Sequence, residues 1–194
     1  MRVMILDGSD KNDDAMNNAR QITEKFFKSA NHEINAFTLR DLRIAPCCGF
    51  FCCWIKTPGI CIVNDIACDI GKSAMISDYW IFFTPVTFGG YSSELKKAID
   101  RMTPILLPHF TKARGEVHHK PRYENHPHLV VFGSTKNYDA EIEDIFNSLT
   151  QRNSINFHNR SVASKVILQT DSLNTIKAKV IEAFSKVVIN REYE

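Results

Sequence analysis

Short apolar runs alternate with longer amphipathic segments along the whole chain. Five of the runs are rich in β-branched and aromatic residues and are too short for helices, which predicts β-strands. The predicted strands are Arg2 to Asp7, Glu33 to Leu39, Tyr79 to Phe83, His128 to Phe132 and Val162 to Leu168. The third run is apolar at every position, as expected of a strand that is buried on both faces of a sheet.

The segments between these strands carry apolar residues at helical spacing. The first helix is predicted to begin near Ala15 with Asp13 or Asp14 as its cap, and Ser92 is predicted to cap a later one. A short helix is expected within Asp65 to Ile76. The first helix is expected to turn Ala19, Ile22 and Phe26 inward. The later helices are marked by apolar stripes at Leu95, Ala98, Ile99, Met102 and Leu106, at Ile142, Ile145, Phe146 and Leu149, and at Leu173, Ile176, Val180, Phe184 and Val187.

The alternation of strands and helices predicts an α/β fold with a parallel sheet, because parallel crossovers place helices on both faces of the sheet. A chain of 194 residues is long enough for one substantial core and short for two. We therefore expect a single domain over residues 1–194. The span from Pro108 to Pro127 lacks a clear pattern and is expected to be irregular.

Composition and charge narrow the classes of partner. The formal charge of +2 comes from interspersed acidic and basic residues without a basic block, so neither nucleic acid nor a membrane surface is an expected partner. No uninterrupted run of about eighteen apolar residues and no signal-peptide pattern occurs, which predicts a cytoplasmic protein. The six cysteines then indicate reduced thiols, metal ligands or redox groups rather than a disulfide framework.

Polar loops follow three of the predicted strands, at the edge where open parallel sheets bind ligands. The loop from Thr84 to Gly90 contains a proline and two glycines, so its backbone can approach a ligand closely. The loop that begins at Gly8 has the position of a phosphate cradle at a helix N-terminus, although an Asp-capped helix without a phosphate is the alternative. The short loop that begins at Gly133 is by itself only weak evidence for a ligand site, and it counts because it follows a predicted strand at the same edge of the sheet.

Three stretches resemble a known family. TPVTFGGYSSELKKAIDR, from Thr84 to Arg101, looks like the second flavin-contacting loop and the following helix of the flavodoxin-like NAD(P)H-dependent FMN reductases, a group that includes the iron–sulfur flavoproteins. GSDKND at Gly8 to Asp13 is similar to the first phosphate loop of that family, and PCCGFFCCWIKTPGIC at Pro46 to Cys61 to its cysteine-rich segment. The resemblance implies a flavodoxin-like three-layer sandwich with a five-stranded parallel sheet in the order 2-1-3-4-5.

The same resemblance implies an FMN site built from the three loops. Its residues would be Ser9, Lys11, Asn12 and Ala15 in the first loop, Pro85, Val86, Thr87, Phe88 and Gly89 in the second, and Gly133 and Ser134 in the third. The first loop is more acidic than is usual in the family, and Thr87 stands where the family often has Tyr. No side chain is expected to act as a catalytic acid or base, because the flavin carries the chemistry.

The implied function is an FMN-dependent oxidoreductase that takes a hydride from NAD(P)H and passes electrons to a quinone, a flavin or another small acceptor. The alternative is a non-catalytic redox or ligand-binding protein of the same fold with a degenerate flavin site. No GxGxxG fingerprint for tight dinucleotide binding occurs, so NAD(P)H is expected to visit the flavin only transiently. The histidine-rich span from Pro108 to Pro127 is expected to contribute to a homo-oligomer rather than to a metal site.

The cysteine-rich segment departs from the pattern that its resemblance implies. Iron–sulfur flavoproteins have four thiolates spaced C-x2-C-x2-C with a fourth a few residues later. Cys47, Cys53 and Cys61 match three of these positions, but Phe50 occupies the other. Partly buried thiols, a cluster or zinc site, and a redox-active thiol pair all remain open. We predict that this segment holds neither an iron–sulfur cluster nor a structural metal.

Overall fold

The structure is a computed structural model that describes residues 1–189 of the chain. Its strands are β1 (Arg2–Asp7), β2 (Glu33–Thr38), β3 (Tyr79–Pro85), β4 (Leu106–Ala113), β5 (Glu116–Pro121), β6 (His128–Thr135) and β7 (Val162–Leu168). Its helices are α1 (Asp14–Ser29), α2 (Cys52–Ile55), α3 (Ala67–Ile76), α4 (Ser93–Asp100), α5 (Ala140–Asn156) and α6 (Leu173–Ile189), with short 3-10 turns η1 (Leu39–Asp41) and η2 (Thr103–Ile105). All five predicted strands are present.

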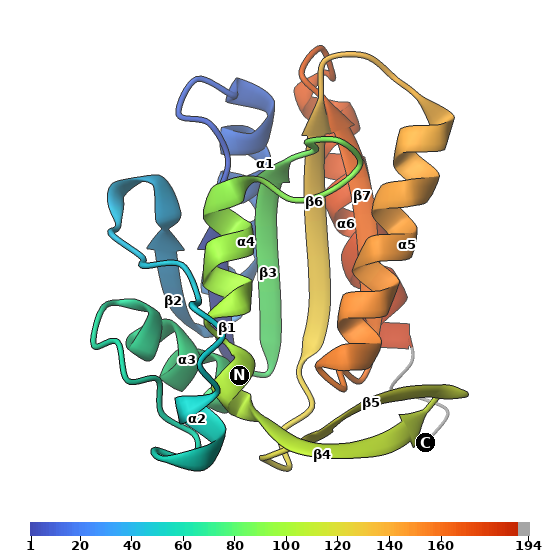
Figure 1. Ribbon diagram of the computed structural model, residues 1–194. Helices are drawn as coiled ribbons and strands as arrows, with labels where there is room; N and C mark the ends of the chain where they lie inside the picture. Colours follow the sequence, from blue (N-terminus) through green and yellow to red (C-terminus); the bar gives the residue numbers. More distant parts are fainter. Residues whose placement is uncertain (190–194) are drawn as a thin grey trace.

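A five-stranded parallel sheet forms the middle layer, with strand order β2-β1-β3-β6-β7. Helices α1 and α6 cover one face, and α3, α4 and α5 cover the other (Figure 1). When the five strands of this sheet are numbered consecutively, the order is 2-1-3-4-5. The α/β class and the predicted flavodoxin-like order are therefore confirmed.

Strand β3 lies at the centre of the sheet because both of its faces are apolar. Tyr79, Ile81 and Phe83 pack toward α1 and α6, whereas Trp80 and Phe82 pack toward the opposite helices. Successive side chains of a strand point to opposite faces, so an unbroken apolar run supplies two cores at once. None of these five side chains is more than 3% exposed.

The prediction that the span from Pro108 to Pro127 is irregular is wrong. Most of it belongs to an antiparallel hairpin of β4 and β5, which lies outside the main sheet at the bottom of Figure 1. Arg114 and Gly115 connect the strands with φ of 49° and 83°, the positive values of a two-residue type I′ turn. The pair was easy to overlook because Arg is a rare choice where Asn or Asp usually precedes the glycine.

One inward position of the first helix was also assigned to the wrong residue. Phe27, not Phe26, is buried against the sheet, while Phe26 is 48% exposed. Phe26 stacks on Phe184 of α6, with ring centroids 5.4 Å apart. Helix α6 packs beside α1 and contacts both Phe26 and Phe27 through Phe184. The apolar pattern of α1 alone contains no information on this neighbouring helix.

The described residues contain no helix with the length and apolarity to cross a membrane. A cytoplasmic location stays a prediction. The single-domain assignment over residues 1–194 also stays a prediction, since its last five residues lie outside the described part of the chain.

A glycine pair tests how tightly the sheet packs on α5. A Cβ at Gly133 of β6 would lie 2.6 Å from a Val86 methyl carbon and 2.8 Å from the ring of Phe146. Gly133→Ala should therefore lower the free energy of unfolding by about 1–3 kcal/mol, the usual effect of overpacking a core. Urea unfolding monitored by circular dichroism measures it.

Gly71 provides the matched control, because a Cβ at this position within α3 would meet nothing within 4 Å. Gly71→Ala should raise stability by roughly 0.5–1 kcal/mol, since alanine has the higher helix propensity. Equal urea midpoints for Gly133→Ala and the wild type would contradict the packing described here.

Candidate functional site

The three predicted loops meet at one edge of the sheet, beyond the C-terminal ends of β1, β3 and β6 at the top of Figure 1. Gly8 donates its backbone N–H to the carbonyl of Phe83 at 2.8 Å. Val86 donates in the same way to the carbonyl of Ser134 at 2.9 Å. The strand pairing thus continues into the loops and fixes them side by side.

The second loop is a tight turn that presents one aromatic ring. Thr87 and Gly90 exchange two backbone hydrogen bonds of 2.9 Å each. Between them Phe88 and Gly89 have φ of 49° and 73°, which defines a type I′ turn. The Phe88 side chain at its tip is fully exposed.

This placement of Phe88 is unfavourable for both its backbone and its side chain. The left-handed conformation costs a bulky L-residue about 1–2 kcal/mol. An exposed ring adds no burial to offset that strain. Strained residues persist where the surroundings hold them, and they cluster at ligand-binding sites. Phe88 is therefore a candidate ligand contact on geometric grounds.

Gly89 is needed for packing as well as for its backbone angle. A Cβ at Gly89 would lie 2.6 Å from the Cγ2 atom of Ile145 on α5. The turn therefore rests on α5 through Gly89 while Phe88 projects from its tip. A large side chain at Gly89 would displace the turn, so loss of ligand binding in such a variant would not identify a direct contact.

Ser92 joins the second loop to the first. Its Oγ donates to the carbonyl of Gly8 at 2.9 Å and accepts the N–H of Leu95 at 3.3 Å, so the predicted cap of α4 is present. The N–H of Ser92 donates to Thr84 Oγ1 at 2.8 Å. A single serine thus fixes the start of α4 against both loops.

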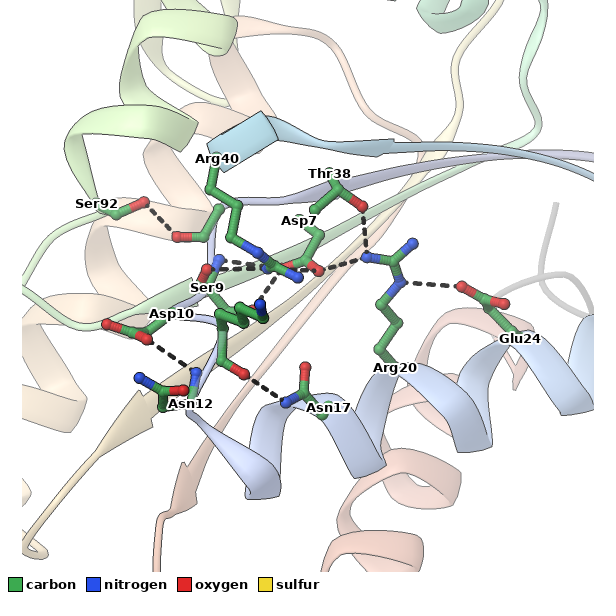
Figure 2. Close-up of polar contacts among 12 residues, drawn as sticks. Asp7, Ser9, Asp10, Asn12, Asn17, Arg20, Glu24, Thr38, Arg40 and Ser92 are labelled. Carbon is green, nitrogen blue, oxygen red and sulfur yellow. Dashed lines mark hydrogen bonds and ion pairs between the residues drawn. The ribbon is translucent and has the colours of Figure 1, made fainter. Parts of the chain in front are cut away.

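The first loop is organised around the buried carboxylate of Asp7 (Figure 2). Ser9 donates to Asp7 Oδ1 from its backbone N–H at 3.0 Å and from its hydroxyl at 2.5 Å. Arg20 of α1 and Arg40 of η1 reach Asp7 Oδ2 at 2.5 and 3.5 Å. A buried charge requires such compensation. The hydroxyl and N–H of Ser9 are consequently both committed to Asp7.

Two further carboxylates use donors of the same loop. Asp10 Oδ1 accepts the N–H of Asn12 at 2.9 Å (Figure 2), and Asp13 Oδ1 caps α1 by accepting the N–H of Met16 at 3.0 Å. Asp13 is only 4% exposed. Of the two caps predicted for α1, Asp13 and Asp14, the structure has Asp13. The N-terminus of α1, where an anion would bind, is already capped by the negatively charged carboxylate of Asp13.

Other first-loop residues remain accessible. Lys11 and Asn12 have exposed side chains, whereas Ala15 is buried in the first turn of α1. A phosphate at this edge would meet the ammonium of Lys11 and the amide of Asn12, together with the exposed carboxylates of Asp10 and Asp14.

The third loop contributes unsatisfied hydroxyl groups at the end of β6. Ser134 Oγ and Thr135 Oγ1 are buried, and neither has a hydrogen-bond partner among the described residues. Buried polar atoms without partners are rare and call for an explanation such as a ligand or ordered water. Gly133, by contrast, is fully explained by its contacts with Val86 and Phe146.

The model of the NADPH-dependent FMN reductase family matches residues 1–153, more than three quarters of the chain. The protein belongs to this family. The resemblance noted in the sequence is therefore confirmed. The expectations of an oxidoreductase with FMN as cofactor and NAD(P)H as donor agree with this family assignment.

A curated relative is an iron–sulfur flavoprotein of Methanocaldococcus jannaschii, 35% identical over 75 residues, which are 39% of this chain and 38% of that protein. The match thus covers less than two fifths of the relative's length. Among solved structures, an NAD(P)H:quinone oxidoreductase from Methanothermobacter marburgensis has a TM-score of 0.69 at 13% identity, covering 100% of this chain and 98% of that one. A Bacillus anthracis azoreductase has a TM-score of 0.65 at 11% identity with full coverage of both chains. These structures show that the fold is shared.

Sequence reasoning missed the residues that hold the first loop together. Asp7 was predicted only as the last residue of a strand, and Arg20 and Arg40 had no assigned role. A charged residue that ends an otherwise apolar run was the available signal. Its partners lie 13 and 33 residues away and could be found only in the folded chain.

The cysteine-rich segment lies elsewhere, around α2 at the bottom of Figure 1. Cys47 and Cys48 are exposed, and Cys53 and Cys61 are half-buried. Burial and the neighbouring Cys61 and Cys47 thiols raise the pKa of Cys53. In the described part of the chain, no three or more His, Cys, Asp or Glu side chains are grouped in an arrangement suited to a metal ion. Anaerobic purification with iron and sulfide analysis remains the direct test of the predicted absence of a cluster.

An ion pair anchors this segment to the core. Arg101, at the end of α4, donates to both carboxylate oxygens of Asp65 at 2.9 Å and to the carbonyls of Ala45 and Val63 at 2.9 and 2.8 Å. Burial alone would raise the pKa of Asp65, but the hydrogen bonds from Arg101 and from two backbone amides outweigh burial and lower it.

Asp65→Asn should therefore destabilise the protein in a pH-dependent way. A lowered folded-state pKa gives stability that is present above the unfolded pKa of about 3.9 and is lost as the pH falls through the lower folded value. We expect a loss of about 3 kcal/mol at pH 7, because Arg101 is left unpaired. Urea unfolding at pH 7, 5 and 3 should show this difference unchanged between the first two and smaller at the third.

Asp69→Asn is the control, since Asp69 is exposed and pairs with Lys72 of the same helix α3 at 2.9 Å. Its effect should stay below about 0.5 kcal/mol, as is usual for surface pairs. A difference between wild type and Asp65→Asn that does not shrink at pH 3 would contradict the role given to the ionised carboxylate.

Proposed function

We propose that this protein is an FMN-dependent NAD(P)H oxidoreductase that reduces a quinone, a flavin or another small acceptor. The observation that carries the proposal is Phe88, an aromatic residue held in a strained turn and fully exposed at the ligand edge of the sheet. Membership of the FMN reductase family supplies the flavin that such a ring can contact. The acceptor class follows the solved quinone oxidoreductase and azoreductase that share the fold.

The isoalloxazine ring is proposed to lie against the second and third loops. When bound, FMN supplies hydride and electron transfer between NAD(P)H and the acceptor. The chain binds and orients it through the turn from Pro85 to Gly89, including Val86 and Thr87, and through Gly133 and Ser134. The rigid seat of Gly89 on Ile145 keeps this surface in place. The exposed side of Phe88 leaves room for a donor or acceptor to approach.

The phosphate is proposed to lie over the first loop, near Ser9, Lys11, Asn12 and Ala15. Lys11 and Asn12 offer accessible donors, whereas the donors of Ser9 are used by Asp7. The carboxylate of Asp13 opposes an anion at this end of α1. The flavin is therefore expected to be held more by its ring than by its phosphate.

A homo-oligomer remains part of the proposal. The β4–β5 hairpin extends away from the main sheet and exposes the large apolar side chains of Phe110 and Val117, each 65% exposed. Exposed apolar residues on a projecting hairpin favour contact with a second copy of the chain. Light scattering after deletion of His118 to Arg122 would test whether the hairpin takes part.

Phe88→Ala should lower the affinity for FMN about tenfold, because aromatic stacking contributes about 1–1.5 kcal/mol. Stability should be nearly unchanged, because alanine keeps the Cβ that causes the backbone strain and the exposed ring contributes no burial. Quenching of FMN fluorescence on titration with protein measures the affinity.

Phe110→Ala is the control, another exposed phenylalanine, on strand β4 at the opposite end of the molecule. It should leave the FMN affinity unchanged. A wild-type protein that shows no flavin spectrum after addition of FMN and no NADPH oxidation with a quinone would favour the non-catalytic alternative. Equal FMN affinities for Phe88→Ala and wild type would remove Phe88 from the site.

Asp13→Ser tests the electrostatic part of the proposal. Serine is also a good helix cap, so α1 should keep its start while one buried negative charge is removed. The affinity for FMN should rise about tenfold, equivalent to about 1.4 kcal/mol of removed repulsion. Riboflavin, which has no phosphate, should bind equally well to both proteins. A gain for riboflavin as large as that for FMN would show that Asp13 does not face the phosphate.

A further inference from the structure

A cavity of about 330 Å³ lies at the far end of α4 from the flavin loops. Its walls come from α3, from the segment after α2, from the end of α4 and from η2. Ser92 at the start of α4 contacts the first loop, whereas Arg101 at the end of the same helix lines the cavity. A helix of this length spans about 12 Å, so the cavity is separate from the proposed flavin site. Its volume lies in the range of small-molecule pockets.

The walls of the cavity are mainly apolar, and its lining includes two cationic side chains. Ile60, Met75 and Ile105 supply the apolar surface. Lys72, which also pairs with the exposed Asp69, and Arg101, which pairs with Asp65, supply the cationic groups. No Asp or Glu side chain is among the residues that line it, within the part of the chain that the structure describes. This combination favours a molecule that is mostly apolar and carries a negative charge.

Arg101 leaves one donor for such a molecule. The side chain is buried, and both terminal nitrogens are used by Asp65 and by backbone carbonyls. Its Nε–H has no acceptor among the described residues. The thiol of Cys61 contacts the guanidinium, but sulfur is a weak acceptor. A carboxylate or sulfonate oxygen that reached this buried atom would satisfy the donor.

Gly71 keeps the cavity open from the side of α3. It lies inside a ten-residue helix, where glycine is normally unfavourable. A Cβ at this position would meet no atom within 4 Å, so a side chain there would extend into unoccupied space next to the cavity wall. Packing thus does not require the glycine, whereas a large side chain at this position would fill the cavity.

We propose that this cavity binds a small, flat and mainly apolar molecule with a single carboxylate or sulfonate group. The anionic group lies near Arg101 and Lys72, and the apolar part packs on Ile60, Met75 and Ile105. This binding is independent of the flavin, because none of these residues belongs to the three flavin loops.

The probe is 8-anilinonaphthalene-1-sulfonate, which combines a flat apolar body with one sulfonate. Binding is measured by isothermal titration calorimetry in the presence of saturating FMN, so that the flavin loops are not available to the probe. Gly71→Leu should lower the affinity at least tenfold by filling the cavity. Gly71→Ala, which adds only one carbon at the same site, should stay within twofold of the wild type. Circular dichroism melting curves confirm that both variants are folded.

Two variants of Lys72 and an uncharged analogue of the probe test whether the cavity recognises the negative charge. Lys72→Gln should weaken binding about threefold to tenfold, and Lys72→Arg should restore it. N-phenyl-1-naphthylamine, the same ring system without the sulfonate, should bind at least tenfold more weakly than the probe. Bound probe should also slow the alkylation of Cys61 and Cys68, which line the cavity, and leave the exposed Cys48 unaffected.

Three results would overturn the proposal. The first is a wild-type protein that does not bind the probe. The second is equal affinity in Gly71→Leu and Gly71→Ala. The third is loss of binding when FMN is added, which would place the probe at the flavin loops. Failure of FMN binding alone would affect the proposed oxidoreductase function and leave this cavity untouched.

Discussion

The ligand edge of this protein depends on one buried carboxylate. Asp7 ends the strand β1, and its two oxygens tie together the first loop through Ser9, helix α1 through Arg20 and the turn after β2 through Arg40. Breaking a buried pair of this kind costs about 3–5 kcal/mol. Arg20 and Arg40 lie 13 and 33 residues from Asp7 in sequence but contact it in the folded chain. The charge of Asp7 therefore sets the shape of the first loop before any ligand is present.

This arrangement explains how a member of the FMN reductase family can have such an acidic first loop. Asp7 is compensated by two arginines, and Asp10 and Asp13 use backbone N–H groups of the loop and of α1. The carboxylates have taken roles that stabilise the loop itself. The second loop, in contrast, lowers the stability of the folded state, because the Phe88 backbone is strained and its side chain is exposed. The first loop is thus stabilised by its own carboxylates, whereas the second holds an exposed ring in a strained turn.

A second region with charged and thiol side chains beside a cavity lies at the opposite end of α4. The Asp65–Arg101 pair holds the cysteine-rich segment against the core, and the same arginine lines the cavity beside α3. A helix with Ser92 at one end and Arg101 at the other links the two regions physically. The shared rigid element gives each region a fixed position relative to the sheet.

The sequence by itself determined the α/β class, the five parallel strands and the three loops at one edge. Patterns such as the apolar run from Tyr79 to Phe83 record burial directly, because each strand residue must suit the face it occupies. The cap at Asp13 was likewise a local property. Only the tertiary structure decided that Phe27 rather than Phe26 faces inward, that Gly89 rests on Ile145, and that Asp7 meets Arg20 and Arg40. These contacts join residues far apart in sequence, and no local pattern encodes which distant side chain will be the neighbour.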